Sequence, residues 1–214
     1  MTLQTELDAG LAALDLPLTS TARTHLLRYI ALMAKWNTVY NLTAIREESR
    51  MLTHHLLDAL SVERFLPKGA SIVDIGSGGG VPGIPLAVAR QDIEVISIEP
   101  NSKKASFQQQ VRIDLGLENF NVQTARAEAV TLEPGRDFVI SRAFGDLIDF
   151  IKVAGHLLKP GGHMLAMKGV YPDEEVRAIP AGWKLVRAEE LQVPGVDGAR
   201  HLLWLARDAA VAGG

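Results

Sequence analysis

Apolar residues in the first third of the chain recur every three or four positions, which is the spacing of one face of an α-helix. This pattern predicts one helix over residues 3–14 and a second that begins at a capping residue, Thr19 or Ser20. A third helix is predicted over residues 47–65. We therefore expect residues 1–69 to form a helical extension that packs on the rest of the protein.

The pattern changes at residue 70, where short aliphatic runs alternate with helical segments. Strands are predicted at residues 71–75, 94–98, 121–124, 137–141 and 162–168, and helices at residues 84–90, 103–115 and 147–158. Strands that alternate with helices indicate βαβ units and a parallel sheet. The predicted fold class is therefore α/β, with a Rossmann-like, mostly parallel sheet.

The end of the chain follows a different pattern. Residues 183–193 and 201–207 are both strand-like, and the Gly- and Pro-containing segment 194–198 between them is too short for a helix. This arrangement predicts a β-hairpin, so one terminal strand should run antiparallel to the others. We assign residues 70–208 to the α/β domain and expect the small-residue tail, 209–214, to fray.

A glycine-rich segment, Asp74-Ile-Gly-Ser-Gly-Gly-Gly-Val-Pro-Gly83, joins the first predicted strand to the next helix. Glycine lets the backbone approach a ligand closely, and a helix N-terminus offers free N–H groups. Counted from Gly78, the segment fits the dinucleotide fingerprint G-x-G-x-x-G. Counted from Gly76, it fits the first motif of class I methyltransferases, in which an acid stands two positions before the first glycine. Asp74 favours this second interpretation, because a carboxylate complements the sulfonium of S-adenosylmethionine and repels a pyrophosphate.

A second acid, Glu99, directly follows the second predicted strand. An acid at this place can accept hydrogen bonds from ribose hydroxyls in either kind of cofactor, so it supports adenosine binding without choosing between them. No Tyr-x-x-x-Lys pattern or other obvious hydride-transfer pair follows in the sequence. This disfavours an NAD-dependent oxidoreductase.

The composition and the missing motifs exclude some classes of methylation reaction. The 214 residues include no cysteine, which excludes the covalent cysteine adduct needed to methylate C5 of a pyrimidine. The sequence also lacks the Asn-Pro-Pro-Tyr and Asp-Pro-Pro-Tyr signatures of enzymes that methylate exocyclic amines. A nucleophile with a free lone pair, such as guanine N7, needs little acid-base help, since proximity and orientation can supply most of its rate. The net charge of −3 means that an RNA partner requires a local basic surface.

Basic residues stand where ligands bind in open α/β sheets, beyond the carboxyl ends of the strands. Arg126 and Arg142 follow the third and fourth predicted strands, and Lys168 ends the fifth. These three are candidates for positioning a substrate, and no residue is assigned a catalytic role. Two histidines stand near Asp58 on the predicted third helix without a third ligand, so no metal site is predicted.

Several longer segments together point to one family. They are Trp36-Asn37, Tyr40-Asn-Leu-Thr-Ala-Ile45, His55-Leu-Leu-Asp58, the glycine-rich segment with its extension Pro82-Gly-Ile-Pro85, Ser141-Arg-Ala-Phe144, Lys168-Gly169, Leu191-Gln-Val-Pro194 and Arg200-His201-Leu202. Over nearly its whole length, the chain resembles the bacterial small-subunit (16S) ribosomal RNA methyltransferase G family, also called glucose-inhibited division protein B. The glycine-rich segment alone is typical of a superfamily, whereas the extension at residues 82–85, Asn41-Leu-Thr43 and Ser141-Arg-Ala-Phe144 together are specific to this family.

The resemblance implies transfer of a methyl group from S-adenosylmethionine to N7 of one guanine in 16S ribosomal RNA, by in-line displacement without a covalent enzyme intermediate. Besides Asp74, the implied cofactor site comprises Gly76, Gly78, Val81, Glu99, Ala127, Glu128 and Arg142. The implied partner is 16S ribosomal RNA or the small ribosomal subunit. We expect a cytoplasmic monomer without a membrane-spanning or export segment.

Two other functions stay open at the level of sequence. The fingerprint at residues 78–83, followed by Glu99 about 20 residues on, is compatible with an NAD-dependent oxidoreductase. A non-enzymatic ribosomal RNA-binding factor that keeps a methyltransferase fold would bind the ribosome without turnover. These alternatives differ in the ligand that stabilises the protein and in whether a methyl group moves.

Overall fold

The computed structural model describes residues 2–142 and 144–208, so the tail predicted to fray lies outside the described residues. Within these ranges one sheet contains the strands β1 (Ser71–Ile75), β2 (Glu94–Ile98), β3 (Phe120–Gln123), β4 (Arg136–Ser141), β5 (Leu158–Lys168), β6 (Trp183–Glu190) and β7 (His201–Arg207). The longer helices are α1 (Leu3–Ala13), α2 (Ser20–Tyr40), α5 (Gly83–Ala89), α6 (Ser102–Leu115) and α7 (Leu147–Ala154). The short helical elements are α3 (Glu48–Met51), η1 (Leu52–Leu57), α4 (Asp58–Leu60), η2 (Glu63–Phe65), η3 (Ala127–Ala129), η4 (Gly155–Leu157) and α8 (Asp173–Arg177).

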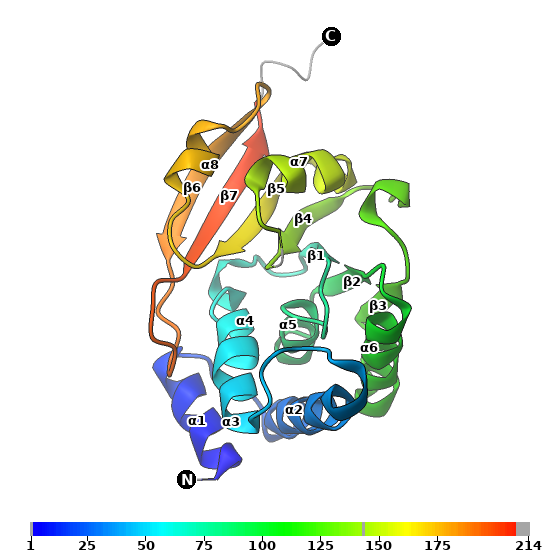
Figure 1. Ribbon diagram of the computed structural model, residues 1–214, viewed down its shortest axis with the longest axis vertical. Coiled ribbons are helices and arrows are strands. Elements are labelled where there is room, and N and C mark those ends of the chain that lie inside the picture. The colour runs from blue at the N-terminus through cyan, green and yellow to red at the C-terminus, as the bar shows by residue number, and fades with distance from the viewer. Residues whose placement is uncertain (1, 143, 209–214) are drawn as a thin grey trace.

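The sheet has the strand order β3-β2-β1-β4-β5-β7-β6 (Figure 1). Strands β1 to β5 pair in parallel, and β7 pairs antiparallel with both β5 and β6. The predicted α/β class and the antiparallel hairpin strand are therefore confirmed. Because β1 lies between β2 and β4, the strand order reverses there, and ligands bind in such sheets at the carboxyl ends beside that reversal.

Two apolar clusters cover the two faces of the sheet. The helices α1 to α6 lie on one side of the sheet, and α7 lies on the other (Figure 1). Ile72 of β1 packs in the cluster that includes Leu26 of α2, whereas its neighbour Val73 packs in the cluster that includes Phe150 of α7. This alternation follows from the strand geometry, which points successive side chains to opposite faces. The N-terminal helices thus share one continuous core with the sheet.

The first two helices begin as the sequence predicts. Thr19 caps α2, and its side-chain oxygen accepts a hydrogen bond from the backbone N–H of Ala22. Helix α2 ends at Asn41, which adopts a left-handed conformation with φ of 48°. The buried side chain of Asn37 then holds the following turn, since it accepts from Thr43 N–H and donates to the carbonyl of Ile45.

The predicted third helix, 47–65, is not one continuous α-helix. It consists of α3, the wider π-helical element η1, then α4 and the 3₁₀ turn η2. A π-helical turn places one extra residue in the helix, and such turns are frequent at functional sites. Here the turn contains His54 and His55, both of which contact Arg142. Hydrophobic spacing did not reveal this extra residue.

Three further differences lie in the second half of the chain. Helix α7 ends at Ala154 rather than 158, and β5 begins at Leu158 instead of 162. Residues 159–161 were assigned to neither element, but they lie in β5 where its register with β4 shifts, as happens at a β-bulge. The short helix α8 was not predicted. None of the helices in the described ranges has the length and apolarity needed to span a bilayer.

Candidate functional site

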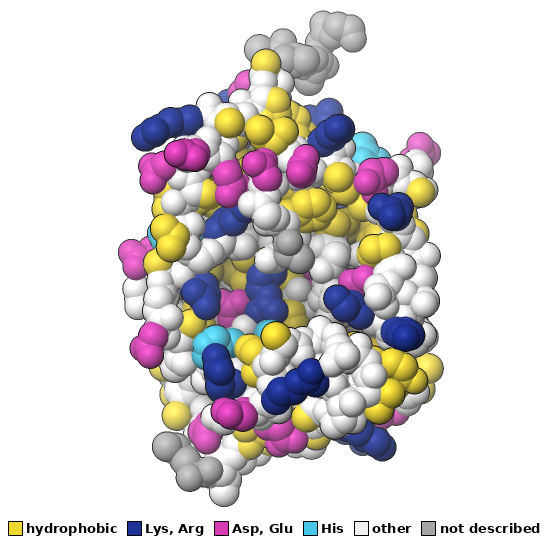
Figure 2. Space-filling model, in the orientation of Figure 1, with side chains coloured by type: hydrophobic (Ala, Val, Ile, Leu, Met, Phe, Trp, Pro, Cys, Tyr) yellow, Lys and Arg dark blue, Asp and Glu magenta, His cyan; other side chains and the backbone are white. Residues whose placement is uncertain are grey.

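Two cavities adjoin the carboxyl ends of β1, β4 and β5. One of about 250 Å³ is lined by residues 76–79, Val81 and Lys104 among others, and we call it the glycine-loop cavity. The other, of about 310 Å³, is lined by residues that include Asp58, Lys168 and Arg200, and we call it the arginine cavity. Arg142 lines both. Figure 2 shows a hollow in the middle of this face, with Lys and Arg side chains in and around it.

The glycine-rich loop has a backbone that only glycine adopts readily. Gly76, Gly78 and Gly80 have φ values of 64°, 58° and 83°, in the left-handed region. A Cβ at Gly80 would collide with the side chain of Ile84. A Cβ at Gly78, by contrast, would meet no heavy atom within 4 Å. The space beside the Gly78 backbone is therefore free, so a ligand can approach the loop closely.

A buried polar network holds this loop in place. The hydroxyls of Ser77 and Ser97 lie 2.5 Å apart, and Ser97 donates to Oε1 of Gln108 at 2.6 Å. The Gln108 amide then donates to Ser77 Oγ at 2.7 Å and to the Gly78 carbonyl at 2.8 Å. Gln108 is fully buried, so its amide depends on these partners. Helix α6 thereby fixes the loop from behind.

Glu99 follows β2 and lies behind the loop, but it is not among the residues that line the cavity, and its contact with a ribose stays a prediction. Its Oε2 accepts a hydrogen bond from Gly78 N–H, and its Oε1 accepts from Asn101 N–H, each at 2.8 Å. The carboxylate is buried, with 4% of the residue exposed. Each carboxylate oxygen has a second lone pair, so Glu99 can hold the loop and still accept a hydroxyl.

Asp74 is completely buried under the loop and is not among the residues that line the glycine-loop cavity. Its Oδ2 accepts from Gly83 N–H at 2.8 Å, at the N-terminus of α5. Its Oδ1 has no hydrogen-bond partner among the described residues. Burial raises the pKa of Asp74 to about 7, against the opposing effects of the Gly83 N–H and the Arg142 charge. Direct contact between Asp74 and a cofactor stays a prediction.

The N-terminal helices complete the glycine-loop cavity. Met33 of α2 and Leu42 and Thr43 after it are lining residues. The buried hydroxyl of Tyr29 donates to the carbonyl of Gly79 at 2.7 Å, which ties α2 to the loop. Gly76, Gly78 and Val81, which the family resemblance implied as cofactor-site residues, line this cavity, and their contact with a cofactor stays a prediction.

Arg142 contacts three groups of the broken third helix. Its Nη1 donates to the His54 carbonyl at 2.6 Å and to Asp58 Oδ2 at 3.0 Å, and its Nη2 donates to His55 Nδ1 at 3.0 Å. Because a guanidinium only donates, His55 Nδ1 must be the accepting nitrogen. The other nitrogen, Nε2, then donates to Thr43 Oγ1 at 2.8 Å. Burial and the Arg142 charge lower the pKa of His55 to about 4, so the imidazole is neutral at pH 7.

The arginine cavity brings together residues from distant parts of the chain. Asp58 of α4 faces Arg142 on one side and Arg200, before β7, on the other, where Arg200 Nε lies 3.3 Å from Oδ1. The Asp58 side chain is only 5% exposed, whereas the two arginines are 27% and 28% exposed. One buried carboxylate therefore positions two partly accessible guanidinium groups.

Lys168 lines the same cavity, but its ammonium is already engaged. It donates to the carbonyls of Phe144 and Gly145 at 3.2 and 2.9 Å and to Glu175 Oε2 at 2.8 Å. An ammonium has three donors, and these contacts use all of them. Lys168 thus fixes the segment after Arg142 against α8, which is a positioning role within the protein.

The other predicted residues follow β3 and line neither cavity. Arg126 and Glu128 are exposed, and Ala127 is buried in the short helix η3. The Arg126 side chain has no ion-pair or hydrogen-bond partner among the described residues, whereas its backbone carbonyl accepts from Ala129 N–H. The sequence thus places these three at the correct edge of the sheet, and their contact with a ligand stays a prediction.

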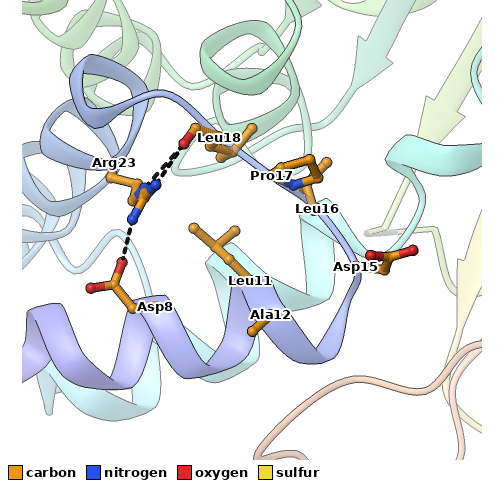
Figure 3. A pocket seen from close by; sticks show the side chains of 8 residues that line it. All are labelled: Asp8, Leu11, Ala12, Asp15, Leu16, Pro17, Leu18 and Arg23. Carbon is orange, nitrogen blue, oxygen red and sulfur yellow. Dashed lines mark hydrogen bonds and ion pairs between the residues drawn. The ribbon is translucent and has the colours of Figure 1, made fainter.

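A third cavity, of about 370 Å³, lies far from these groups, between α1 and the start of α2 (Figure 3). Arg23 crosses its rim, where Nη1 meets Asp8 Oδ1 at 3.3 Å and the guanidinium also donates to the Leu18 carbonyl. Both partners of this ion pair are 41% exposed, so it is a solvated surface contact. The cavity has no group that points to chemistry.

Sequence reasoning missed Tyr29, Lys104 and Arg200 as site residues. Tyr29 reaches Gly79 across 50 positions in the sequence, and no local pattern encodes such a contact. Lys104 stands in the first turn of the helix after Glu99, so its place could have been inferred from strand order. Arg200 belongs to a segment that the family resemblance had singled out, and this signal was available but was given no role.

The sequence is similar to that of known proteins over most of its length. The sequence model of the family described as rRNA small subunit methyltransferase G matches residues 22–203. A protein named ribosomal RNA small subunit methyltransferase G from Azoarcus sp. (strain BH72) is 52% identical over 198 residues, covering 92% of this chain and 93% of that one. The protein of the same name from Ralstonia nicotianae is 48% identical, with 96% of each chain covered.

Solved structures agree at the level of the fold. A SAM-dependent methyltransferase from Aquifex aeolicus superposes with a TM-score of 0.58 at 18% identity, covering 73% of this chain and 92% of that one. At this identity the likeness concerns the fold alone. The family match and the close relatives, by contrast, extend over most of the chain and over both cavities. This chain belongs to the rRNA small subunit methyltransferase G family.

Proposed function

We propose that this protein transfers a methyl group from S-adenosylmethionine to N7 of a guanine in 16S ribosomal RNA. The observation that carries the proposal is an acid-preceded glycine loop that frames a cavity, in a chain of a ribosomal RNA methyltransferase family. Membership of this family excludes the NAD-dependent oxidoreductase. A ribosomal RNA-binding factor without turnover is the alternative that the experiment below tests.

The residues around the glycine-loop cavity fit S-adenosylmethionine. The open space at Gly78 leaves room for a ligand against the backbone. Glu99 keeps lone pairs for ribose hydroxyls while it holds the loop. The unpartnered Oδ1 of Asp74 lies behind the loop, and the ionised form of this carboxyl favours a cationic ligand over a pyrophosphate. By the family resemblance, Ala127 and Glu128 would hold the adenine.

S-Adenosylmethionine, when bound, supplies an electrophilic methyl carbon on its sulfonium. The residues of the chain contribute position rather than acid-base chemistry. Both ring nitrogens of His55 are engaged, so this histidine has no free nitrogen to accept a proton. An acceptor that attacks through a free lone pair needs no such base, and guanine N7 is one. Met33 and Leu42 provide apolar walls that exclude water from the donor side.

We further propose that residues 1–69 act as an extension that closes the glycine-loop cavity of the domain at 70–208. The Tyr29 hydrogen bond to Gly79 and the lining residues after α2 support this role. The substrate is 16S ribosomal RNA or the small ribosomal subunit, and we propose that the protein acts on it as a cytoplasmic monomer. Arg126, exposed beyond β3, is a candidate for contact with this RNA.

A methyl-transfer assay tests the proposal. Small ribosomal subunits that lack the modification are incubated with the protein and S-adenosylmethionine labelled in its methyl group, and the RNA is digested to nucleosides. We expect the label in 7-methylguanosine at one position of 16S RNA. Label in another nucleoside would overturn the N7 assignment, and subunit binding without any label would favour the RNA-binding factor.

A further inference from the structure

The arginine cavity has a charge that the protein itself does not balance. Lys168 is paired with Glu175 at 2.8 Å. Arg142 and Arg200, however, share the single carboxylate of Asp58. One positive charge in the cavity therefore lacks a protein counter-charge, and it lies at partly exposed guanidinium groups.

The guanidinium donors of the arginine cavity are partly exposed, whereas the Asp58 carboxylate that accepts from them is buried. The carboxylate oxygens of Asp58 lie next to Arg142 and Arg200, and only 5% of this side chain is exposed. Arg142 uses three donor contacts, and Arg200 makes the ion pair with Asp58 and donates from Nη1 to the Ala199 carbonyl. A guanidinium has five N–H donors, so both side chains keep donors that meet no partner among residues 2–142 and 144–208.

We propose that the arginine cavity binds one backbone phosphate of the acceptor RNA strand, with Arg200 as the residue that contacts it. This inference rests on the proposed function, because it assigns a subsite to that RNA. A phosphate is an anion with several acceptor oxygens, which matches a cavity of spare guanidinium donors. Asp58 acts through the arginines as a positioning residue.

The position of the cavity suits this ligand. Arg142 lines both cavities, so a phosphate held beside Arg200 belongs to a strand that runs next to the glycine-loop cavity. Met167 and Leu191 also line the arginine cavity and give an apolar wall beside the charged groups, which suits a sugar. The protein as a whole has a net charge of −3, so this local positive charge, rather than general attraction, must direct the strand.

The test compares three variants of the full chain. Arg200→Ala removes the guanidinium, and Arg200→Lys keeps the charge but loses the bidentate donor geometry. Arg177→Ala removes an exposed arginine of α8 that lines neither cavity, and it serves as the matched control. Two quantities are measured for each: KM for unmodified small subunits in the methyl-transfer assay, and the salt dependence of binding to the corresponding 16S RNA fragment.

We expect Arg200→Ala to raise KM about tenfold, since a hydrogen bond to a charged group is lost, with a much smaller change in kcat. The slope of log binding constant against log salt should fall by about 0.7 to 0.9, the value for one phosphate contact. Arg200→Lys should keep the slope and raise KM partly, and Arg177→Ala should change neither. Affinity for S-adenosylmethionine, measured by calorimetry, should stay constant in all three.

Two failures are distinguishable. If the wild-type protein transfers no methyl group, the proposed function fails. If the wild type is active and Arg200→Ala retains both its KM and its salt slope, the function stands and the phosphate subsite is wrong. A change in kcat alone, with an unchanged slope, would also overturn the subsite, because it would assign Arg200 to the reaction centre instead.

Discussion

The two cavities that meet at Arg142 are built in opposite ways. The glycine-loop cavity has the open backbone of one segment, 76–81, along one side, and a buried network of Ser77, Ser97 and Gln108 holds that segment in place. The arginine cavity is formed by residues from five separate parts of the chain, and its main feature is charge. The first suits a small molecule that lies against the backbone, and the second suits a polyanion that approaches from solvent.

This difference separates two tasks. Backbone and glycine give a fixed shape, which favours one ligand with a defined outline. Guanidinium groups on a buried carboxylate give directed charge, which suits a phosphate in a long and variable molecule. Changes on the glycine-loop side should therefore affect donor binding, and changes on the arginine side should affect RNA binding. The following variants are arranged from the largest expected effect to the smallest.

Gly78→Leu should give the largest effect. The side chain would project from a residue at φ of 58° into open space at the loop, so it should occupy the donor site. We expect S-adenosylmethionine affinity, measured by calorimetry, to fall by more than about 100-fold, equivalent to roughly 3 kcal/mol.

Gly69→Leu is the matched control for backbone strain. Gly69 also has a positive φ, of 71°, and open space around a Cβ, but it lies outside both cavities. Both variants should lose about 1–2 kcal/mol of stability from the left-handed conformation. Equal loss of donor affinity in the two variants would show that strain, rather than occupation of the cavity, is the cause.

Asp58→Asn should weaken the arginine side while leaving the glycine loop intact. The variant keeps the shape of the side chain but loses the charge that holds Arg142 and Arg200. We expect kcat/KM for RNA methylation to fall about 100-fold and stability to fall by about 2 kcal/mol, below the value for a fully buried pair because the arginines are partly exposed.

Asp8→Asn is the surface control for Asp58→Asn, because it removes a carboxylate from the exposed pair with Arg23 (Figure 3), and it should cost at most about 1 kcal/mol and leave methylation unchanged. Stability is measured by urea unfolding and activity by initial rates.

For Asp58→Asn, we expect a larger rise in the KM for RNA than in the Kd for S-adenosylmethionine. The opposite result would contradict the assignment of RNA binding to the arginine cavity and donor binding to the glycine-loop cavity.

Asp74→Asn should change how stability depends on pH. Burial raises the pKa of Asp74 from 3.8 to about 7, so between these values the folded protein binds a proton that the unfolded chain has lost. The contribution of Asp74 to stability is therefore present below pH 4 and is lost as the pH rises through 7. The asparagine variant should be more stable than wild type at pH 8, by up to about 4 kcal/mol, and should lose this advantage near pH 4.

His55 shifts in the opposite sense, but it is present in both proteins and cancels in the difference. Thermal unfolding across this pH range measures the effect. A constant difference between variant and wild type would show that Asp74 is ionised throughout. Weaker S-adenosylmethionine binding by the variant at pH 8 would support a role for the Asp74 charge in donor binding.

Tyr29→Phe should give the smallest effect. The variant loses one buried hydrogen bond to the Gly79 carbonyl, at about 1 kcal/mol. Because this bond ties α2 to the loop, donor affinity should fall a few-fold while KM for RNA stays unchanged. An unchanged donor affinity, measured by calorimetry, would mean that the N-terminal helices pack on the domain without shaping its donor site.

The same contrast explains what the sequence predicted well. The α/β class, the antiparallel strand and the loop at Gly76 to Val81 depend on short-range patterns, because hydrophobic period and glycine spacing act locally. Glu99 lies at the expected edge of the sheet because parallel strands bring their carboxyl ends together, and its contact with a ribose stays a prediction. Arg142 was found for the same reason.

The arginine side could not be predicted in the same way. Its pairing of Asp58 with Arg200 joins positions 142 residues apart, and the π-helical turn at His54 and His55 leaves no trace in the hydrophobic period. Lys168 was correctly placed at the strand edge, but its partners, the segment after Arg142 and Glu175, emerge only from the packing of β5 against α8. Such contacts depend on tertiary structure.

The most direct test of this division is a crystal structure of the protein with S-adenosylhomocysteine and a short RNA that contains the acceptor guanine. The account predicts S-adenosylhomocysteine against Gly78 and Glu99, and a phosphate of the RNA within hydrogen-bond distance of Arg200. A phosphate seated at the glycine loop, or S-adenosylhomocysteine in the cavity lined by Asp58 and Arg200, would contradict it.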